Sequence, residues 1–312
     1  MIGDCVSIGF ALVFVPGVIF GWLIVAHNLR VRRTQRLYRS LPPDFRTRVL
    51  DRIDEAGRDS RACSLLVAEE VDAESGSRDV TASRFGGSQP YAEAGDSWPP
   101  SEEGSDAPAN FLIQVRLDSS FPSPWAGRLI VVFSKFDPDQ TVRVYENPTV
   151  ARYAALSGGP APQREWSLRS VSIPKPRRSS AETATEVGDG DPESESGLLD
   201  YDPVVLFDGV PGLRDELTPF TRRPADLLAI LIAPNYYKYE FTILDIVQVG
   251  GRPVWLQDDP SPLKCEQCGR PMRFLFQFGD LNGGVTLGDA GVCYVFGCDE
   301  HPDNATGTVQ MC

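Results

Sequence analysis

The sequence repeats itself at one long offset, and this repeat limits the folds that the chain can adopt. Three segments of the first half recur in the second: Gly86-Gly87 as Gly250-Gly251, the motif Phe-Leu-x-Gln of 111–114 at 274–277, and the Ala-Gly run of 126–133 at 290–296. The paired segments lie 163 or 164 residues apart and keep the same order. A period of this length indicates a duplicated module, because solenoid repeats are much shorter.

Each copy of the module is predicted to contain a turn and two paired strands. A Gly-Gly pair supplies backbone angles that other residues avoid, and the two segments that follow have the composition of strands. Strand alternation predicts that the side chains of Gln114 and Gln277 face a polar seam between the halves. The alternative is that both lie in edge strands and bond to water. Further strands are predicted at 64–70, 141–145, 166–173, 241–247 and 254–257, and a helix at 225–232.

The N-terminus carries an uncharged run that is typical of a membrane span. No charged residue lies between Cys5 and Ala26, and as a helix this run would extend about 33 Å, close to the thickness of a bilayer core. Asp4 is the only charged residue before the run, and no clear cleavage motif follows it, so the pattern favours an anchor over a cleaved signal peptide.

Arginines follow the uncharged run at once, in the Arg30–Arg39 region. Because positive charge stays on the cytoplasmic side, we expect a single-pass protein of the cell membrane with the bulk of the chain in the cytoplasm. This basic region is predicted to lie against anionic lipid, unless it acts only as a stop-transfer signal. The whole chain has a net charge of −13, which argues against nucleic acid as a partner.

The organisation follows from these patterns and from changes in composition. After Pro42-Pro43, apolar residues recur at helical spacing from Phe45 to Ala56 and predict a short amphipathic helix. Residues 93–109 and 177–200 are poor in large apolar side chains and are expected to be unstructured. The predicted parts are a transmembrane anchor (1–27), a basic juxtamembrane linker with the amphipathic helix (28–62), a first half (63–176), a disordered acidic insert (177–200) and a second half with a cysteine cluster (201–312). The fold class is therefore β-rich α+β, with two pseudo-repeated antiparallel β modules behind one N-terminal transmembrane helix.

The cysteines favour metal binding over disulfides. There are seven, an odd number, and five of them follow residue 264, unlike a secreted disulfide framework. Cys265 and Cys268 have the Cys-x2-Cys spacing that lets two thiolates reach one ion. A tetrahedral zinc site would need two more ligands, for which Cys298, Cys312 and His301 are the candidates. Cys293 lies inside a predicted strand and is expected to be a buried apolar residue.

At this point the motifs can be compared with a known family. The segments that carry the comparison are 83–87, 111–117, 249–259, 265–278, 288–296 and the terminal Gln-Met-Cys of 310–312. From about residue 64 to the C-terminus the chain resembles the YwqG family of bacterial proteins and, more distantly, the C-terminal domain of programmed cell death protein 2. The resemblance implies a cytoplasmic β-rich domain of two similar halves, a metal site in some members, and a role in handling another protein. The membrane span and the acidic insert are outside the family pattern.

The resemblance also ranks the metal ligands. Because the terminal Gln-x-Cys belongs to the family pattern, it favours Cys265, Cys268, Cys298 and Cys312 as ligands of a structural zinc ion, with His301 as the alternative fourth ligand.

Enzymatic chemistry has little support in the sequence. The only histidines are His27 and His301, which excludes a Ser-His-Asp triad and a three-histidine zinc site. Asp280 and Asp289 could serve acid–base chemistry, yet an aspartate beside glycine also fits a tight turn. We predict no catalytic residue, and expect a membrane-anchored module that binds an unknown protein partner as a chaperone, adaptor or immunity-like protein. The alternative is a carboxylate-dependent hydrolase or a metal-responsive regulator acting at the membrane.

Overall fold

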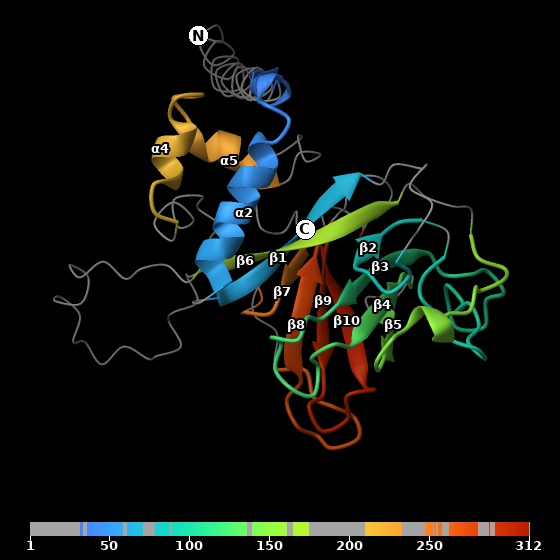
Figure 1. Cartoon of the computed structure of the whole chain (residues 1–312). Coiled ribbons are helices and arrows are strands. Elements are labelled where there is room, and N and C mark those ends of the chain that lie inside the picture. The colour runs from blue at the N-terminus through green and yellow to red at the C-terminus, as the bar shows by residue number, and fades with distance from the viewer. Residues whose placement is uncertain are drawn as a thin grey trace, which may run out of the picture.

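The computed structural model of the chain describes residues 32–33, 36–58, 61–70, 79–87, 89–135, 139–160, 165–174, 210–232, 247–251, 253, 255–257, 262–279, 287 and 291–311. Ten strands form one closed antiparallel barrel (Figure 1). The strands are β1 (Arg61–Glu70), β2 (Arg84–Phe85), β3 (Phe111–Arg116), β4 (Leu129–Phe133), β5 (Asp139–Tyr145), β6 (Trp166–Pro174), β7 (Val247–Val249), β8 (Arg273–Phe278), β9 (Val292–Gly297) and β10 (Ala305–Gln310). The helices are α2 (Phe45–Arg58), α4 (Leu213–Leu217) and α5 (Pro224–Ile232), with a short 3-10 turn, η1 (Val150–Arg152).

The strand order is the same in the two repeats. Strands β2, β3, β4 and β5 pair in succession, and so do β7, β8, β9 and β10. The two sets meet at β5 and β10 on one side, while β1 and β6 lie between β2 and β7 on the other. The repeats therefore share one closed barrel instead of forming the two separate β modules that the sequence predicts. Closure pairs the edge strands that two separate modules would leave open.

The Gly-Gly turns have the conformation that the sequence predicts. Gly86 and Gly250 follow β2 and β7 with positive φ angles of 66° and 70°. The N–H group of Gly86 donates to the carbonyl oxygen of Leu112 at 3.3 Å, and that of Gly250 donates to Leu275 at 2.8 Å. Each turn is thus bonded to the leucine of the Phe-Leu-x-Gln motif in its own repeat.

A β-bulge explains the Phe-Leu-x-Gln motif. The register shifts between Phe111 and Ile113 in β3, and between Phe274 and Phe276 in β8. Because one extra residue is inserted, the phenylalanine and the glutamine three positions later share a face. That face is the outer one, so Gln114 lies neither at a seam between halves nor in water. It is fully buried, and its amide accepts from the N–H of Tyr91 at 2.9 Å.

The Gln114 side chain holds a surface loop onto the barrel, which gives a first prediction. Its Nε2 donates to the carbonyl oxygens of Val80 at 2.9 Å and Ala82 at 2.7 Å. We expect Gln114→Leu to lower the free energy of unfolding by about 2–3 kcal/mol, because buried polar groups lose their partner. Denaturant unfolding measures the loss. Gln257→Leu, at an exposed position, is the matched control and should change stability by less than about 0.5 kcal/mol; equal effects of the two changes would contradict this reading.

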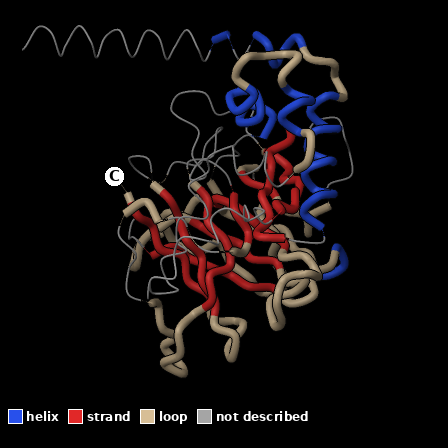
Figure 2. The backbone as a smooth tube through the Cα atoms, turned by 90° about the vertical axis from the view of Figure 1, so that its left-hand side faces the viewer, coloured by secondary structure: helices blue, strands red, loops and turns tan. Residues whose placement is uncertain are grey.

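Helices cover one side of the barrel (Figures 1 and 2). The buried side chains of α2, α4 and α5 form one apolar cluster with the outward residues of β1 and β6. Helix α2 begins at Phe45, after Pro42-Pro43-Asp44, as the spacing predicts. A Cβ atom on Gly57 would lie 2.2 Å from the carbonyl oxygen of Ser172, so this glycine permits the close approach of α2 to β6. A second cluster, formed by inward residues of the strands, fills the barrel.

The remaining predictions of local structure have mixed outcomes. Strands at 64–70, 141–145 and 166–173 and the helix at 225–232 are confirmed by β1, β5, β6 and α5. Residues 255–257 are not in a strand as predicted, and 256 and 257 form a bend. The stretch 93–109 was expected to be unstructured, and this is wrong: its Trp98 indole N–H donates to the carbonyl oxygen of Ala109 at 2.5 Å. Apolar contacts of Trp98 with Phe133 supply the burial that composition did not indicate.

Several predictions lie outside the described residues. These are the span at 1–27, the insert at 177–200 and most of the strand at 241–247. Among the helices of the described part of the chain, none combines the length and the apolar character needed to cross a membrane.

Candidate metal centre

Cys265 and Cys268 lie at the tip of a hairpin that leads into β8. The hairpin is closed by a hydrogen bond from the N–H of Met272 to the carbonyl oxygen of Leu263 at 2.8 Å. Nearer the tip, the N–H of Cys265 donates to Arg270 at 2.9 Å, and that of Gly269 donates to Cys265 at 2.7 Å. Gly269 has a φ of 70°. This left-handed residue lets the chain turn back directly after the second cysteine.

Cys298 and His301 lie in the connection between β9 and β10. Cys298 follows the last residue of β9, and its N–H donates to the carbonyl oxygen of Asn304 at 3.1 Å. The N–H of Asn304 donates to His301 at 2.8 Å, so the connection forms a tight turn. The loops that bear the two pairs leave strands at the lower end of the barrel in Figure 1, far from the helices.

The four side chains bring their ligand atoms together. Cys265 Sγ lies 3.6 Å from His301 Nδ1, Cys268 Sγ lies 3.6 Å from Cys298 Sγ, and Cys298 Sγ lies 3.7 Å from His301 Nδ1. All four atoms are within 4.8 Å of one another. Ligand atoms of a tetrahedral zinc site are separated by about 3.5–3.8 Å, given usual zinc–sulfur and zinc–nitrogen bonds. The cluster can therefore hold a metal ion such as zinc.

The local backbone favours a thiolate at Cys265. Burial opposes its ionisation, but hydrogen bonds from the backbone N–H groups of Cys268 and Gln267, and contacts with the side chains of Cys298 and His301, outweigh burial and lower its pKa to about 6. The amide of Asn304 also donates to Cys265 Sγ at 3.3 Å. Such donors stabilise negative sulfur.

A second thiolate is harder to form without a cation. The N–H of Arg270 favours ionisation of Cys268, but desolvation and the neighbouring sulfurs of Cys298 and Cys265 oppose it, and the pKa of Cys268 is raised. A bound cation would remove this repulsion, because it attracts every thiolate around it.

Charged groups beside the cluster fix the loop that bears Cys298 and His301. Both carboxylate oxygens of Asp299 accept from the Arg273 guanidinium, at 2.9 Å and 3.0 Å from its Nε. The indole N–H of Trp125 donates to Asp299 at 2.9 Å. The ion pair with Arg273 outweighs desolvation and holds the pKa of Asp299 below its usual value. Glu300 forms an ion pair with Arg270, which belongs to the cysteine hairpin.

Three of the four favoured ligands and the alternative fourth ligand meet in the structure. Cys265, Cys268 and Cys298 converge, and the fourth ligand atom of the cluster is supplied by His301. Cys312 lies outside the described residues. Cys293 is fully buried in the barrel, and burial raises the pKa of its thiol, in agreement with the expectation of an apolar role.

The carboxylates considered for catalysis do not form a described site. Asp280 and Asp289 lie outside the described residues. Asp299, the third aspartate of this region, is engaged by Arg273 and Trp125. Within the described residues, its role is to fix the β9–β10 connection.

The first repeat builds the same hairpin without sulfur. The bridge between Lys264 and Pro271 has its counterpart between Pro100 and Pro108. At the repeat offset, Ser101 takes the place of Cys265, and Ser134 that of Cys298. Ser134 is bonded to the hairpin stem, since its N–H donates to the carbonyl oxygen of Asn110 at 2.8 Å. Hydrogen bonds thus join the hairpin to the strand connection in the first repeat, at the place where the second repeat has its cluster of three cysteines and a histidine.

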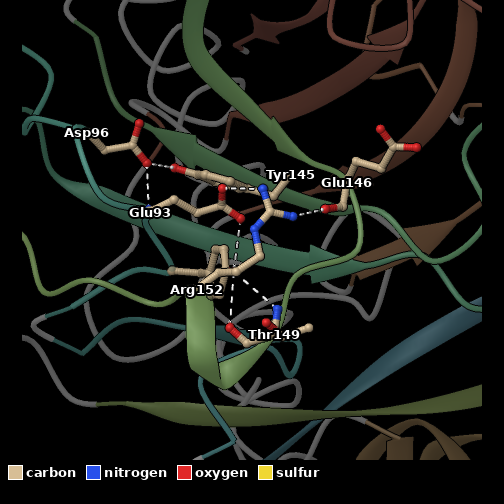
Figure 3. A network of polar contacts seen from close by, with 7 residues as sticks. Glu93, Asp96, Tyr145, Glu146, Thr149 and Arg152 are labelled. Carbon is tan, nitrogen blue, oxygen red and sulfur yellow. Dashed lines mark hydrogen bonds and ion pairs between the residues drawn. The ribbon is translucent and has the colours of Figure 1, made fainter.

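A polar network on the outer face of the first repeat escaped the sequence reasoning (Figure 3). Arg152 binds Glu93 at 2.6 Å, and the phenol of Tyr145 donates to Asp96 at 2.8 Å. Burial and the hydrogen bond to Asp96 raise the pKa of Tyr145. The N–H of Glu93 also donates to Asp96, at 2.8 Å. The acids are thus used to hold the loop at 93–96 against β5, which explains the order of a stretch expected to be unstructured.

Comparison with known proteins adds no family to these observations. The sequence matches no protein-family profile, and no curated protein matches it significantly. The resemblance to the YwqG family stays a prediction from the motifs.

Proposed function

We propose that this chain is a membrane-tethered, cytoplasmic YwqG-like protein that binds another protein and is stabilised by one structural zinc ion. The observation that carries the proposal is the ligand set of Cys265, Cys268, Cys298 and His301. Four protein ligands complete a tetrahedral zinc site, whereas a catalytic zinc keeps one position for water or substrate. Sulfur-rich tetrahedral sites suit zinc among the common cellular divalent ions.

The zinc content of the purified chain tests the site and its fourth ligand. We expect about one zinc per chain under reducing conditions, because a complete four-ligand site binds one ion. His301→Ala should leave much less than one zinc after dialysis, while Cys312→Ser should keep the full content. Elemental analysis measures both variants. No zinc in the unchanged chain would contradict the proposal, and loss of zinc only in Cys312→Ser would restore Cys312 as the fourth ligand.

The binding role is supported by the packing of the barrel and by the ion pairs of the acids near the metal cluster. Large apolar side chains fill the barrel interior, and Asp299 and Glu300 are paired with arginines. A partner would therefore meet the outer surface of the barrel and its loops. Crosslinking in membranes followed by purification tests this role: one stoichiometric protein partner supports it. Turnover of a substrate that disappears in Asp289→Asn, with folding retained, would instead support a carboxylate-dependent hydrolase.

One observation favours a metal-responsive regulator as the second candidate. Cys268 is exposed, although its three companion ligands are buried or half-buried. An exposed ligand gives water and chelators access to the ion. Weak, micromolar zinc affinity would support regulation, whereas zinc that resists prolonged dialysis against a chelator supports the structural role.

A further inference from the structure

We infer that the outer end of the helical layer is a second membrane contact, which holds the barrel against an anionic bilayer surface. This inference rests on the proposed membrane tether but concerns a different part of the chain. The surface, here called the basic face, consists of the α4–α5 connection and the start of α2 with the helical residues before it. Its members are Arg36, Arg39, Arg48, Phe220, Arg222 and Arg223.

Aromatic contacts bring these distant segments together. The ring of Phe220 packs edge-on against the ring of Phe45, with centroids 4.6 Å apart. The guanidinium of Arg48 lies over the Phe45 ring, 5.5 Å from its centroid. The α4–α5 connection therefore lies beside the first turn of α2. Figures 1 and 2 show the connection and the helical residues 36–40 at the same end of the molecule.

The basic face carries exposed arginines that have no ion pair within the described part of the chain. Arg36, Arg39, Arg222 and Arg223 are exposed, and none of them forms an ion pair with the described residues. Among the acids with described side chains in these segments, Asp44 is paired with Arg48, Glu216 is paired with Arg52, and Asp215 is exposed. This local excess of positive charge stands out in a chain whose net charge is −13.

An exposed aromatic ring lies in the same connection as Arg222 and Arg223. Phe220 is 39% exposed, although it follows buried Leu217 and packs on buried Phe45. Arginines around an exposed apolar ring suit the interface of an anionic bilayer, where the ring enters the headgroup layer and the cations meet lipid phosphates.

The position of the face in the chain identifies the bilayer as its occupant. The uncharged run ends at Ala26, only ten residues before Arg36. Even a fully extended chain of ten residues reaches about 35 Å, so a tethered domain stays close to the surface. The basic face is the part of the described structure that the chain reaches first after this run. Docking there would direct the cysteine hairpin at the opposite end of the barrel away from the membrane.

Hydrogen exchange of the full chain in lipid nanodiscs tests the inference. The chain is placed in phosphatidylcholine alone or in phosphatidylcholine mixed with phosphatidylglycerol. We expect exchange at residues 218–223 to slow by roughly fivefold or more in the anionic mixture, since each basic residue near such a surface contributes about that factor in affinity. High salt should remove the protection, because it screens exposed charges.

Charge reversal gives the matched control. Arg222→Glu with Arg223→Glu should abolish the protection, whereas Lys135→Glu, at an exposed position on the β4–β5 connection, should leave it intact. Equal exchange at 218–223 in the two lipid mixtures would overturn the inference. Carbonate washing separates this outcome from failure of the tether: a chain that stays in the membrane but shows no protection has the anchor without the contact. A chain released by carbonate lacks the anchor.

Discussion

Removal of the metal will lower the free energy of unfolding of this chain by about 4 kcal/mol when free zinc is about a thousandfold above its dissociation constant. An ion that binds only the folded protein stabilises it by an amount that grows with the logarithm of the ratio of free ion concentration to dissociation constant. Cys265, Cys268, Cys298 and His301 come together only through folding. Denaturant unfolding with and without a chelator measures the difference. The strands should persist in the metal-free chain, because the first repeat closes the same hairpin without sulfur.

The control for this experiment is a chain that has already lost the site. Cys268→Ser removes an exposed ligand and disturbs no buried packing. In this variant the chelator should have no further effect on the unfolding midpoint. An unchanged midpoint for the original chain after its zinc has been stripped would show that the ion is bound without supporting the fold.

The repeated motifs could be read from the sequence because local physics fixes them. Each repeat has a Gly-Gly pair at positive φ, and the first glycine of each pair is bonded to the corresponding leucine of its own repeat. Because the turn requires these residues, the motif is still recognisable in both halves. The Phe-Leu-x-Gln motif survives for a related reason: a bulge needs its phenylalanine and glutamine on one face. Sequence spacing alone did not reveal the bulge, and so Gln114 was expected at a seam or in water when it is buried.

Closure of the barrel could not be read in this way. Strand β1 pairs with β6 and β7, about a hundred or more residues later in the chain. Such pairing depends on which edges remain open after the local strands have formed, and no periodicity records it. The repeat correctly predicted two halves with the same strand order. It did not indicate that the edge strands of one half pair with those of the other at β5 and β10, and through β1 and β6 on the opposite side.

The metal cluster was predictable to the extent that spacing constrains it. The Cys-x2-Cys pair followed from the positions of the sulfurs, and the resemblance then favoured Cys298 and Cys312 over His301. The approach of His301 to the three cysteines depends on a turn. Hydrogen bonds of Asn304 with Cys298 and His301 form that turn. The Cys-x2-His spacing of Cys298 and His301 was the sequence signal for His301, whereas the C-terminal motif favoured Cys312, which lies outside the described residues.

A tryptophan of the first repeat contacts the β9–β10 connection of the second, which bears Cys298 and His301. Trp125, in the connection between β3 and β4, is fully buried in the barrel, and its indole N–H reaches Asp299. A Cβ atom on Gly297 would lie 2.1 Å from the Trp125 ring, so the indole packs directly on the end of β9. The next residue along the chain is Cys298. Packing inside the barrel and the position of a metal ligand are therefore coupled through this ring.

Truncation of this ring tests the coupling. Trp125→Ala should lower the free energy of unfolding by about 3–5 kcal/mol, as expected for a large side chain removed from a packed core. It should also weaken zinc binding by roughly tenfold to a hundredfold, the usual effect of losing a group that orients metal ligands. Competition with a chromogenic chelator measures the zinc affinity. Trp98→Ala removes an equally large ring that packs on Phe133 in the first repeat, so it should cost stability but leave zinc affinity unchanged. Equal losses of zinc affinity in the two variants would trace the effect to general destabilisation and contradict a specific link from Trp125 through Asp299 to the metal loop.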